Sequence, residues 1–284
     1  MKVPSFKNKS EALDWLAVNK DLLMVEKTNA IKHSDVLTYF GEPTEEKEVT
    51  KATITDINSI EKLSVKSVIN SCGVIDSHFD CHIQGLWKKS LSENKVWYWL
   101  QEHRMLFDHI VADSKANDIK AYTANIAYRQ LGIKGQGETE CLVFEGNIDR
   151  RNEFMFKQYA KGYVHNHSVG MRYVKIFLCV NSEEKDWSEE KKNWDKYYPS
   201  VINKEVADSF GFFYAVTEAK FIEGSAVVIG SNQNTPTIEV EANKELENIE
   251  PSNGDTQNND NHDNEPTKVT QEINTTNFKL NQFY

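Results

Sequence analysis

Five long segments with the composition of β-strands occupy the chain between about residue 65 and residue 230. They are rich in β-branched and aromatic residues, and they cover residues 65–75, 119–128, 138–149, 171–180 and 212–229. The backbone N–H and C=O groups of buried strands must be hydrogen-bonded to neighbouring strands. The five segments therefore predict that the region from about residue 65 to residue 230 folds around β-sheet.

Three further segments predict helices around these strands. Residues 10–17 begin with a capping serine and continue with apolar residues at spacings of three and four. Between residues 187 and 198, aromatic side chains recur at spacings of seven and four, and Pro199 follows directly. A further helix is predicted over residues 88–103. Helices added to a strand-rich body predict an α+β fold.

The composition is that of a soluble protein that is not secreted. The 284 residues are 39% hydrophobic and 11% aromatic, which is enough for a substantial core. The longest apolar runs are of strand length, and the first residues lack the apolar stretch of a signal peptide. Without a secretory signal, the four cysteines, Cys72, Cys81, Cys141 and Cys179, predict reduced thiols in a cytosol.

The charge of the chain is concentrated at its C-terminal end. The formal net charge is −10, and residues 239–284 hold ten Asp and Glu against three Lys. The same residues are rich in asparagine and lack apolar periodicity, which predicts disorder. We expect an N-terminal helical and surface extension over residues 1–64, a folded body over 65–238 and a disordered acidic tail over 239–284. Neither nucleic acid nor a membrane is expected as a partner.

One segment near the middle of the chain combines a serine with histidines, a glycine and the start of a strand. Residues 161–174 contain His165, His167, Ser168 and Gly170. A serine hydroxyl is unreactive at neutral pH unless a base takes its proton and a third group orients that base. Ser168 is therefore a candidate nucleophile if the rest of the chain supplies both partners.

Strand alternation predicts which side chains accompany the serine. If the strand that begins near residue 171 is regular back to residue 168, then Ser168, Gly170 and Arg172 share its more apolar face. Gly170 leaves room for a close approach of backbone. Arg172 offers positive charge to a developing oxyanion.

Four histidines are candidates for the general base. His165 and His167 would point to the face of the strand opposite to Ser168, so a base from elsewhere in the chain is favoured. The two remaining candidates are His103 and His109. Each of the four has an alternative interpretation as a surface or core histidine without catalytic function.

A carboxylate on the last long strand is the candidate third group. Glu223 lies in an otherwise apolar segment and has the parity of Phe221 and Val227. Buried carboxylates need a partner, so an inward-facing Glu223 would serve to orient a histidine. A solvated strand edge is the alternative.

A second cluster offers potential zinc ligands. Cys72, His78, Cys81 and His82 fall within eleven residues, but their spacing does not match the paired ligands of structural zinc sites. No metal and no cofactor are predicted.

Several segments together resemble the prohead proteases of tailed bacteriophages, which are similar to herpesvirus assemblins in fold and mechanism. The resemblance spans roughly residues 70–237. Its segments are residues 75–91, 100–103, 166–171, 222–227 and 234–236. The most specific is 166–171, which has the serine, aliphatic residue and glycine of the family's nucleophile segment. The resemblance implies a mostly antiparallel β-barrel core with surrounding helices, and it makes residues 65–238 the protease domain.

Carried over residue by residue, the resemblance makes Ser168 the nucleophile and His103 the general base. His103 is preferred to His109 because the family's histidine precedes a short turn and then an aliphatic pair, here Ile110-Val111. Glu223 becomes the orienting acid, although the herpesvirus enzymes use a second histidine in that role.

The implied function is that of a serine endopeptidase in the host-cell cytoplasm, inside an assembling procapsid. Its expected partners are the major capsid protein and the scaffold of the phage, with self-association and self-cleavage. The acidic tail would then dock on the scaffold or be removed. A capsid-assembly or scaffold-associated protein that keeps the fold without catalysis is the alternative.

Overall fold

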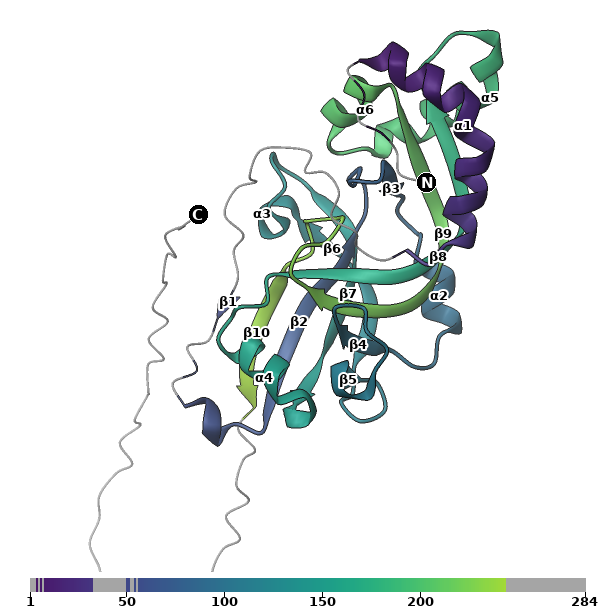
Figure 1. The fold of residues 1–284 in the computed structure, drawn as a ribbon. Coiled ribbons are helices and arrows are strands. Elements are labelled where there is room, and N and C mark those ends of the chain that lie inside the picture. The colour runs from purple at the N-terminus through teal and green to yellow at the C-terminus, as the bar shows by residue number, and fades with distance from the viewer. Residues whose placement is uncertain are drawn as a thin grey trace, which may run out of the picture. The chain divides into compact units, whose positions relative to one another are not determined.

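The computed structural model describes residues 8–32, 50–51 and 56–243, together with residues 4, 6 and 54. Its described strands form two sheets (Figure 1). The first sheet has the order β1-β10-β2-β7-β6. In the second, β9 pairs along one edge with β8 and along the other with β3 and β4, and β5 follows β4.

The strands of the first sheet are β1 (Thr50–Lys51), β2 (Lys62–Ser71), β6 (Lys120–Ala127), β7 (Glu138–Asp149) and β10 (Thr237–Asn243). Those of the second are β3 (Asp80–His82), β4 (Tyr98–Gln101), β5 (Ile110–Asp113), β8 (Asn166–Val180) and β9 (Phe212–Val227). All five strands predicted from the sequence are confirmed, and β7 has the predicted bounds. The short strands β3, β4 and β5 were not predicted.

The helices are α1 (Lys9–Asn29), α2 (Lys88–Glu93), α3 (Tyr128–Leu131), α4 (Glu153–Ala160), α5 (Ser188–Tyr197) and α6 (Lys204–Phe210). The 3-10 helices are η1 (Ile57–Ser59), η2 (Phe107–His109), η3 (Arg150–Asn152), η4 (Lys185–Trp187) and η5 (Tyr198–Ser200). The helix predicted over residues 187–198 is confirmed as α5. The helix predicted over residues 10–17 is also present, but it is longer than predicted and its N-terminal cap is Asn8, whose side chain accepts a hydrogen bond from the N–H of Glu11, and not Ser10.

The expected β-barrel is wrong, whereas the α+β class is confirmed. The second sheet stays open because β3 and β4 add in parallel to one edge of β9, and β5 then extends the sheet away from β8. In the first sheet, the neighbours β10 and β2, β2 and β7, and β7 and β6 pair antiparallel, and β1 pairs in parallel with β10. In the second, β8 with β9 and β4 with β5 are antiparallel. The result is a pair of mixed sheets.

The helix predicted over residues 88–103 is wrong in its second half. Helix α2 ends at Glu93, and the chain continues as strand β4. The reason is tertiary pairing, because Trp99 and Leu100 are buried between two partner strands, β5 and β9. Aromatic residues are more common in strands than in helices, and the segment with Tyr98 and Trp99 accordingly forms a strand.

The expected domain boundaries differ from the structure at two points. Helix α1 contributes Ala12, Leu16 and Leu23 to the main core, so it is an integral part of the folded unit. The predicted start of the tail at residue 239 falls inside β10, which pairs with β2. The predictions for residues 33–49 and 244–284 lie outside the described residues.

The main core fills the space between the two sheets. Ile69 and Phe144 of the first sheet contact the position of Gly224 in β9, and Trp99 of β4 packs edge-on against Phe144. Beyond this core, β8 and β9 continue to α1, α5 and α6 (Figure 1), which pack against the two strands. The ladder of β8 and β9 therefore joins every layer of the described unit.

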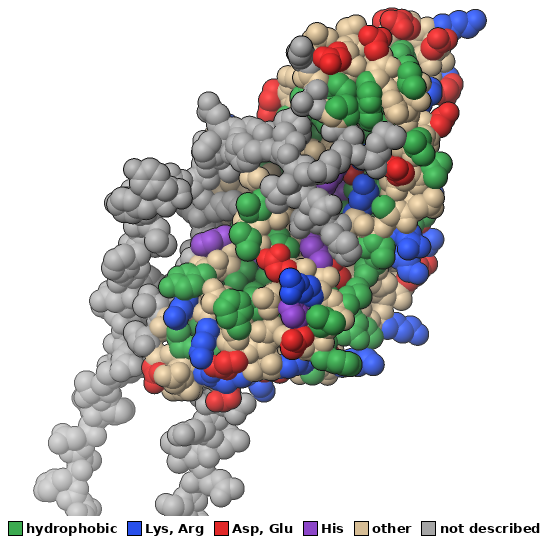
Figure 2. Space-filling view, in the orientation of Figure 1, with side chains coloured by type: hydrophobic (Ala, Val, Ile, Leu, Met, Phe, Trp, Pro, Cys, Tyr) green, Lys and Arg blue, Asp and Glu red, His purple; other side chains and the backbone are tan. Residues whose placement is uncertain are grey.

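The described surface shown in Figure 2 carries acidic and basic side chains interspersed. The described residues also form exposed ion pairs, such as the pair of Lys192 with Glu189 on α5. Among the described residues, no helix combines the length and the apolar character that crossing a membrane requires.

A buried ion pair attaches α1 to the sheet. The Lys27 ammonium lies against the Asp80 carboxylate at the start of β3, with both side chains shielded from solvent. Lys27 also donates to the carbonyl of His78 at 3.0 Å, and the Tyr173 hydroxyl donates to Asp80 at 2.8 Å. Burial alone would raise the pKa of Asp80, but the positive charges of Lys27 and Lys32 and these hydrogen bonds hold it below its usual value.

We predict that Lys27→Met lowers the free energy of unfolding by about 3–5 kcal/mol, because it leaves the Asp80 carboxylate buried without its counter-ion. The matched control Lys192→Met removes an exposed pair and should cost less than about 1 kcal/mol. Urea denaturation at pH 7 measures both. Equal costs for the two variants would contradict the role of the Lys27–Asp80 pair.

The Lys27–Asp80 pair also predicts how the difference in unfolding free energy between the wild-type protein and Lys27→Met depends on pH. In the wild-type protein the lowered pKa of Asp80 contributes stability above its unfolded value, and this contribution is lost as the pH falls through the folded pKa. In Lys27→Met, burial without the cation raises the pKa of Asp80. The carboxylate is therefore protonated at a higher pH, and protonation removes the cost of a buried unpaired charge. We therefore expect the difference in unfolding free energy to shrink between pH 7 and pH 4. A constant difference would contradict this.

Candidate active site

His103 lies in a tight turn that follows β4. The N–H of Arg104 donates to the carbonyl of Gln101 at 3.1 Å, and the two central residues, Glu102 and His103, have φ angles of 52° and 57°. Two consecutive positive φ angles are typical of a type I′ turn, which usually contains Asn or Gly. Non-glycine residues in this conformation are strained by on the order of 1–3 kcal/mol each and are concentrated at functional sites.

Three hydrogen bonds attach this turn to the end of β9. The Glu102 N–H donates to the carbonyl of Ala226 at 3.0 Å, and the Glu102 carboxylate accepts from the N–H of Val228 at 3.0 Å. The N–H of His103 donates to the Ser225 hydroxyl at 3.1 Å. The position of His103 is thus fixed relative to β9.

The imidazole of His103 is hydrogen-bonded to Glu223. Its Nδ1 lies 2.6 Å from Oε1 of the carboxylate, and the Ser225 hydroxyl donates to Oε2 at 2.6 Å. The Glu223 side chain is fully buried, which decides between the two alternatives that the sequence left open. A buried carboxylate paired in this way orients the imidazole ring.

Gly170 allows this arrangement because it leaves space for the carboxylate. It lies opposite Glu223 in the ladder of β8 and β9, and a Cβ atom at residue 170 would overlap Oε1 and lie 2.9 Å from Cδ of Glu223. The carboxylate therefore lies directly over the backbone of Gly170. The sequence analysis expected a backbone to approach Gly170, whereas the structure places a side chain, the Glu223 carboxylate, at this position.

Ser168 is on the same face of the sheet as Glu223 and Ser225. It lies directly opposite Ser225 in the ladder, and side chains opposite one another in an antiparallel pair share a face. It is also two residues from Gly170, whose Cβ direction meets Glu223. The structure therefore brings Ser168, His103 and Glu223 to one face.

The Ser168 side chain is buried and has no hydrogen-bond partner among the described residues. The residue is 8% exposed, and its hydroxyl makes no hydrogen bond within the part of the chain that the structure describes. The hydroxyl and the His103 ring thus share a face without being in hydrogen-bond contact. Such contacts are often long before substrate binds.

The other candidate histidines have different partners. His167 is fully buried and points away from Ser168: its Nε2 lies 2.9 Å from the Tyr159 hydroxyl and its Nδ1 lies 3.1 Å from the carbonyl of Thr235. His109 pairs with Asp108 at 2.8 Å. The structure therefore favours His103 as the histidine that is oriented by a buried carboxylate.

Arg172 does not belong to this group. A β-bulge separates Gly170 from Met171 in the ladder, and the side chain of Arg172 beyond it is exposed. Within the described residues it makes no hydrogen bond or ion pair. The predicted help from Arg172 at an oxyanion is therefore not supported by its position.

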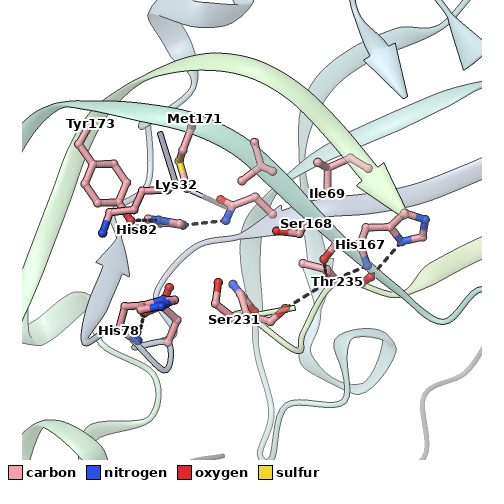
Figure 3. A pocket seen from close by; sticks show the side chains of 14 residues that line it. Lys32, Ile69, His78, His82, His167, Ser168, Met171, Tyr173, Ser231 and Thr235 are labelled. Carbon is pink, nitrogen blue, oxygen red and sulfur yellow. Dashed lines mark hydrogen bonds between the residues drawn. The ribbon is translucent and has the colours of Figure 1, made fainter. Parts of the chain in front are cut away.

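Ser168 borders a pocket at the outer edge of β8 (Figure 3). Lys32 and Tyr173 lie at one end of the labelled side chains and His167 and Thr235 at the other, with Ser168 between them. Further lining residues are Ile69, Asn70, Asp76, His78, His82, Val169, Met171, Ser231 and Asn232. Most of these lining residues have polar side chains, and Ile69, Val169 and Met171 add apolar surface.

A chain of buried hydrogen bonds forms one wall of the pocket. Trp87 Nε1 donates to Asn70 Oδ1 at 3.0 Å, and the Asn70 amide donates to His82 Nδ1 at 2.7 Å. His82 Nε2 lies 3.4 Å from the Tyr173 hydroxyl, which donates to Asp80. Burial lowers the pKa of His82, and the donor at its Nδ1 also favours the neutral ring. This wall is linked through Asp80 to Lys27 of α1.

The four cysteines are buried as free thiols. Burial raises the pKa of each thiol, so none is a reactive thiolate. Among the described residues there is no group of three or more His, Cys, Asp and Glu side chains placed to hold a metal ion. Cys72, His78, Cys81 and His82 thus do not gather into the zinc site considered from their spacing.

Two features of the site were missed from the sequence. Ser225 was not assigned a function, although its position two residues after Glu223 places both on one face of a strand. The buried wall formed by Asn70 and His82 has no local signal, because its members come from β2 and β3 and meet only in the folded chain.

Comparisons with protein-family models, with curated proteins and with solved structures gave no match to the chain.

We predict that Gly170→Ala lowers the free energy of unfolding by about 1–3 kcal/mol, because the new methyl group displaces the Glu223 carboxylate. The same substitution in a Glu223→Ala background should cost less than about 1 kcal/mol, since the overlapping atoms are absent. Urea denaturation of the two single variants and the double variant measures this coupling. Additive costs would show that the carboxylate does not lie over Gly170.

Proposed function

We propose that the chain is a serine endopeptidase in which Ser168 is the nucleophile, His103 the general base and Glu223 the acid that orients the base. The observation that carries the proposal is the 2.6 Å contact between a fully buried carboxylate and a histidine on the face of the sheet that bears Ser168. Burying a carboxylate is costly unless it is paired, so such a pair is a functional-site candidate.

The geometry supports acyl transfer. Glu223 holds Nδ1 of His103, and Nε2 is the nitrogen that accepts the proton of the Ser168 hydroxyl in the proposed mechanism. As the hydroxyl oxygen attacks a peptide carbonyl, His103 becomes positively charged and the Glu223 carboxylate stabilises it. His103 then returns the proton to the leaving amine, and water releases the acyl group from Ser168. The contact between Ser168 and His103 closes when substrate binds.

The substrate class follows from the resemblance to prohead proteases. We propose that the protein cleaves the scaffold, the scaffolding segment of the major capsid protein, and itself, inside an assembling procapsid. Cleavage would make maturation irreversible. The β-barrel is not part of this proposal, because the sheets are open. What remains of the resemblance is the order of base, nucleophile and acid along the chain.

Coexpression with the cognate capsid protein tests this function. We expect Ser168→Ala to reduce processing by a factor on the order of 10³ or more, because the substitution removes the proposed nucleophile. Ser92→Ala is the matched control, since its exposed hydroxyl donates to the carbonyl of Lys89 within α2. Gel analysis and mass spectrometry of the capsid protein give the extent and position of cleavage.

Unchanged processing in Ser168→Ala would contradict the protease assignment. It would favour the alternative function, a capsid-assembly protein that keeps this fold without catalysis. Equal losses in Ser168→Ala and Ser92→Ala would also contradict the specific role of Ser168.

A further inference from the structure

The outer edge of β8 has a gap in its hydrogen bonding beside Ser168. On one side of the gap, the N–H of His167 donates to the carbonyl of Thr235 at 3.0 Å, and the Thr235 hydroxyl donates to the carbonyl of His167 at 2.6 Å. On the other side, Lys32 pairs with Met171 through two backbone hydrogen bonds of 2.8 and 3.3 Å. Both partners approach β8 from the side opposite to β9.

Val169 lies midway between these two bonded positions. In an antiparallel ladder, successive residues direct their backbone groups alternately to the two sides. Because His167 and Met171 point outward, the N–H and C=O of Val169 also point outward, whereas those of Ser168 and Gly170 point toward β9. No partner for Val169 on this outer edge is present in the described part of the chain.

The gap opens into the pocket and not into bulk solvent. Val169 is 5% exposed and lines the pocket together with Ser168. The flanking residues Lys32 and Thr235 appear on the two sides of Ser168 in Figure 3. Backbone groups this well enclosed are normally hydrogen-bonded, so an open pair at one strand position indicates a site for the backbone of a ligand.

We propose that one residue of an extended peptide substrate pairs with Val169, and that the Val169 N–H binds the oxygen of the scissile carbonyl. This inference rests on the proposed function. The C=O of Val169 accepts a hydrogen bond from the N–H of the same substrate residue, as in a regular antiparallel pair. The proposed ligand is therefore an extended peptide, one residue of which pairs with Val169 in the gap between Thr235 and Lys32 on the outer edge of β8.

The donor is placed to act on the charge that develops during the reaction. The Ser168 oxygen forms a bond to the carbonyl carbon, its proton moves to His103, and the π electrons of the carbonyl move to the oxygen. That oxyanion accepts the hydrogen bond from the Val169 N–H. When the C–N bond breaks, the carbonyl re-forms and His103 gives its proton to the leaving amine.

The first test compares Val169→Pro with Val169→Ala. Proline removes the outward N–H and is tolerated at edge-strand positions whose N–H is not used within the sheet, whereas alanine keeps the N–H. We expect kcat for a peptide spanning the mapped cleavage site to be about 10²–10³ times lower in Val169→Pro than in Val169→Ala. A difference of less than about threefold would overturn the inference.

The second test uses the wild-type protein and does not depend on the folding of a variant. N-methylation of the substrate residue that precedes the scissile bond removes its donor to the Val169 carbonyl, and we expect kcat/KM to fall about tenfold. N-methylation one residue earlier removes an N–H that points away from β8 and should have less effect. Equal effects of the two methylations would overturn the inference.

Ser168→Ala in the same assays separates the two levels of the proposal. Cleavage that persists in Ser168→Ala would defeat the proposed function itself. Cleavage that is lost in Ser168→Ala but retained in Val169→Pro at the level of Val169→Ala would overturn only the role of Val169.

Discussion

The antiparallel ladder between β8 and β9 is the constraint on which the rest of the structure depends. Its two strands, Asn166–Val180 and Phe212–Val227, pair over almost their whole length. Register in such a ladder is strict, because a slip of one residue would move every side chain to the other face. The pairing of Ser168 with Ser225 and of Gly170 with Glu223 therefore sets the composition of the candidate site. The same two strands receive α1, α5 and α6 farther along.

Two clusters of buried polar groups next to this ladder favour a single arrangement of the strands and helices around it. At the site, Glu223 is stabilised by the His103 ring and the Ser225 hydroxyl, and the turn that carries His103 is attached to the same strand. Beside the pocket, Lys27 and Asp80 connect α1 to β3 and, through Tyr173, to β8. Each buried charge is costly unless its partner is in place, so both clusters favour one arrangement of the chain.

Local sequence patterns predicted the long strands and α5, because alternation and helical spacing are properties of neighbouring residues. The placement of Ser168, Gly170 and Glu223 on one face could also be predicted from the sequence, since alternation along a strand determines which face each side chain occupies. The strand at Tyr98–Gln101 was predicted as helix because only its pairing with β5 and β9 defines it. The turn at His103 had no glycine or asparagine to mark it. The open sheets and the gap at Val169 depend on pairings between distant segments, which no local pattern contains.

Reaction with a serine-directed fluorophosphonate tests the central claim most directly, because it reports on the nucleophile without requiring the natural substrate. If His103 and Glu223 activate Ser168, peptide mass spectrometry will locate the adduct on Ser168. The rate of labelling will then fall by a factor on the order of 10² or more in His103→Ala and substantially in Glu223→Gln. Labelling at other serines only, or an unchanged rate in His103→Ala, would contradict the account.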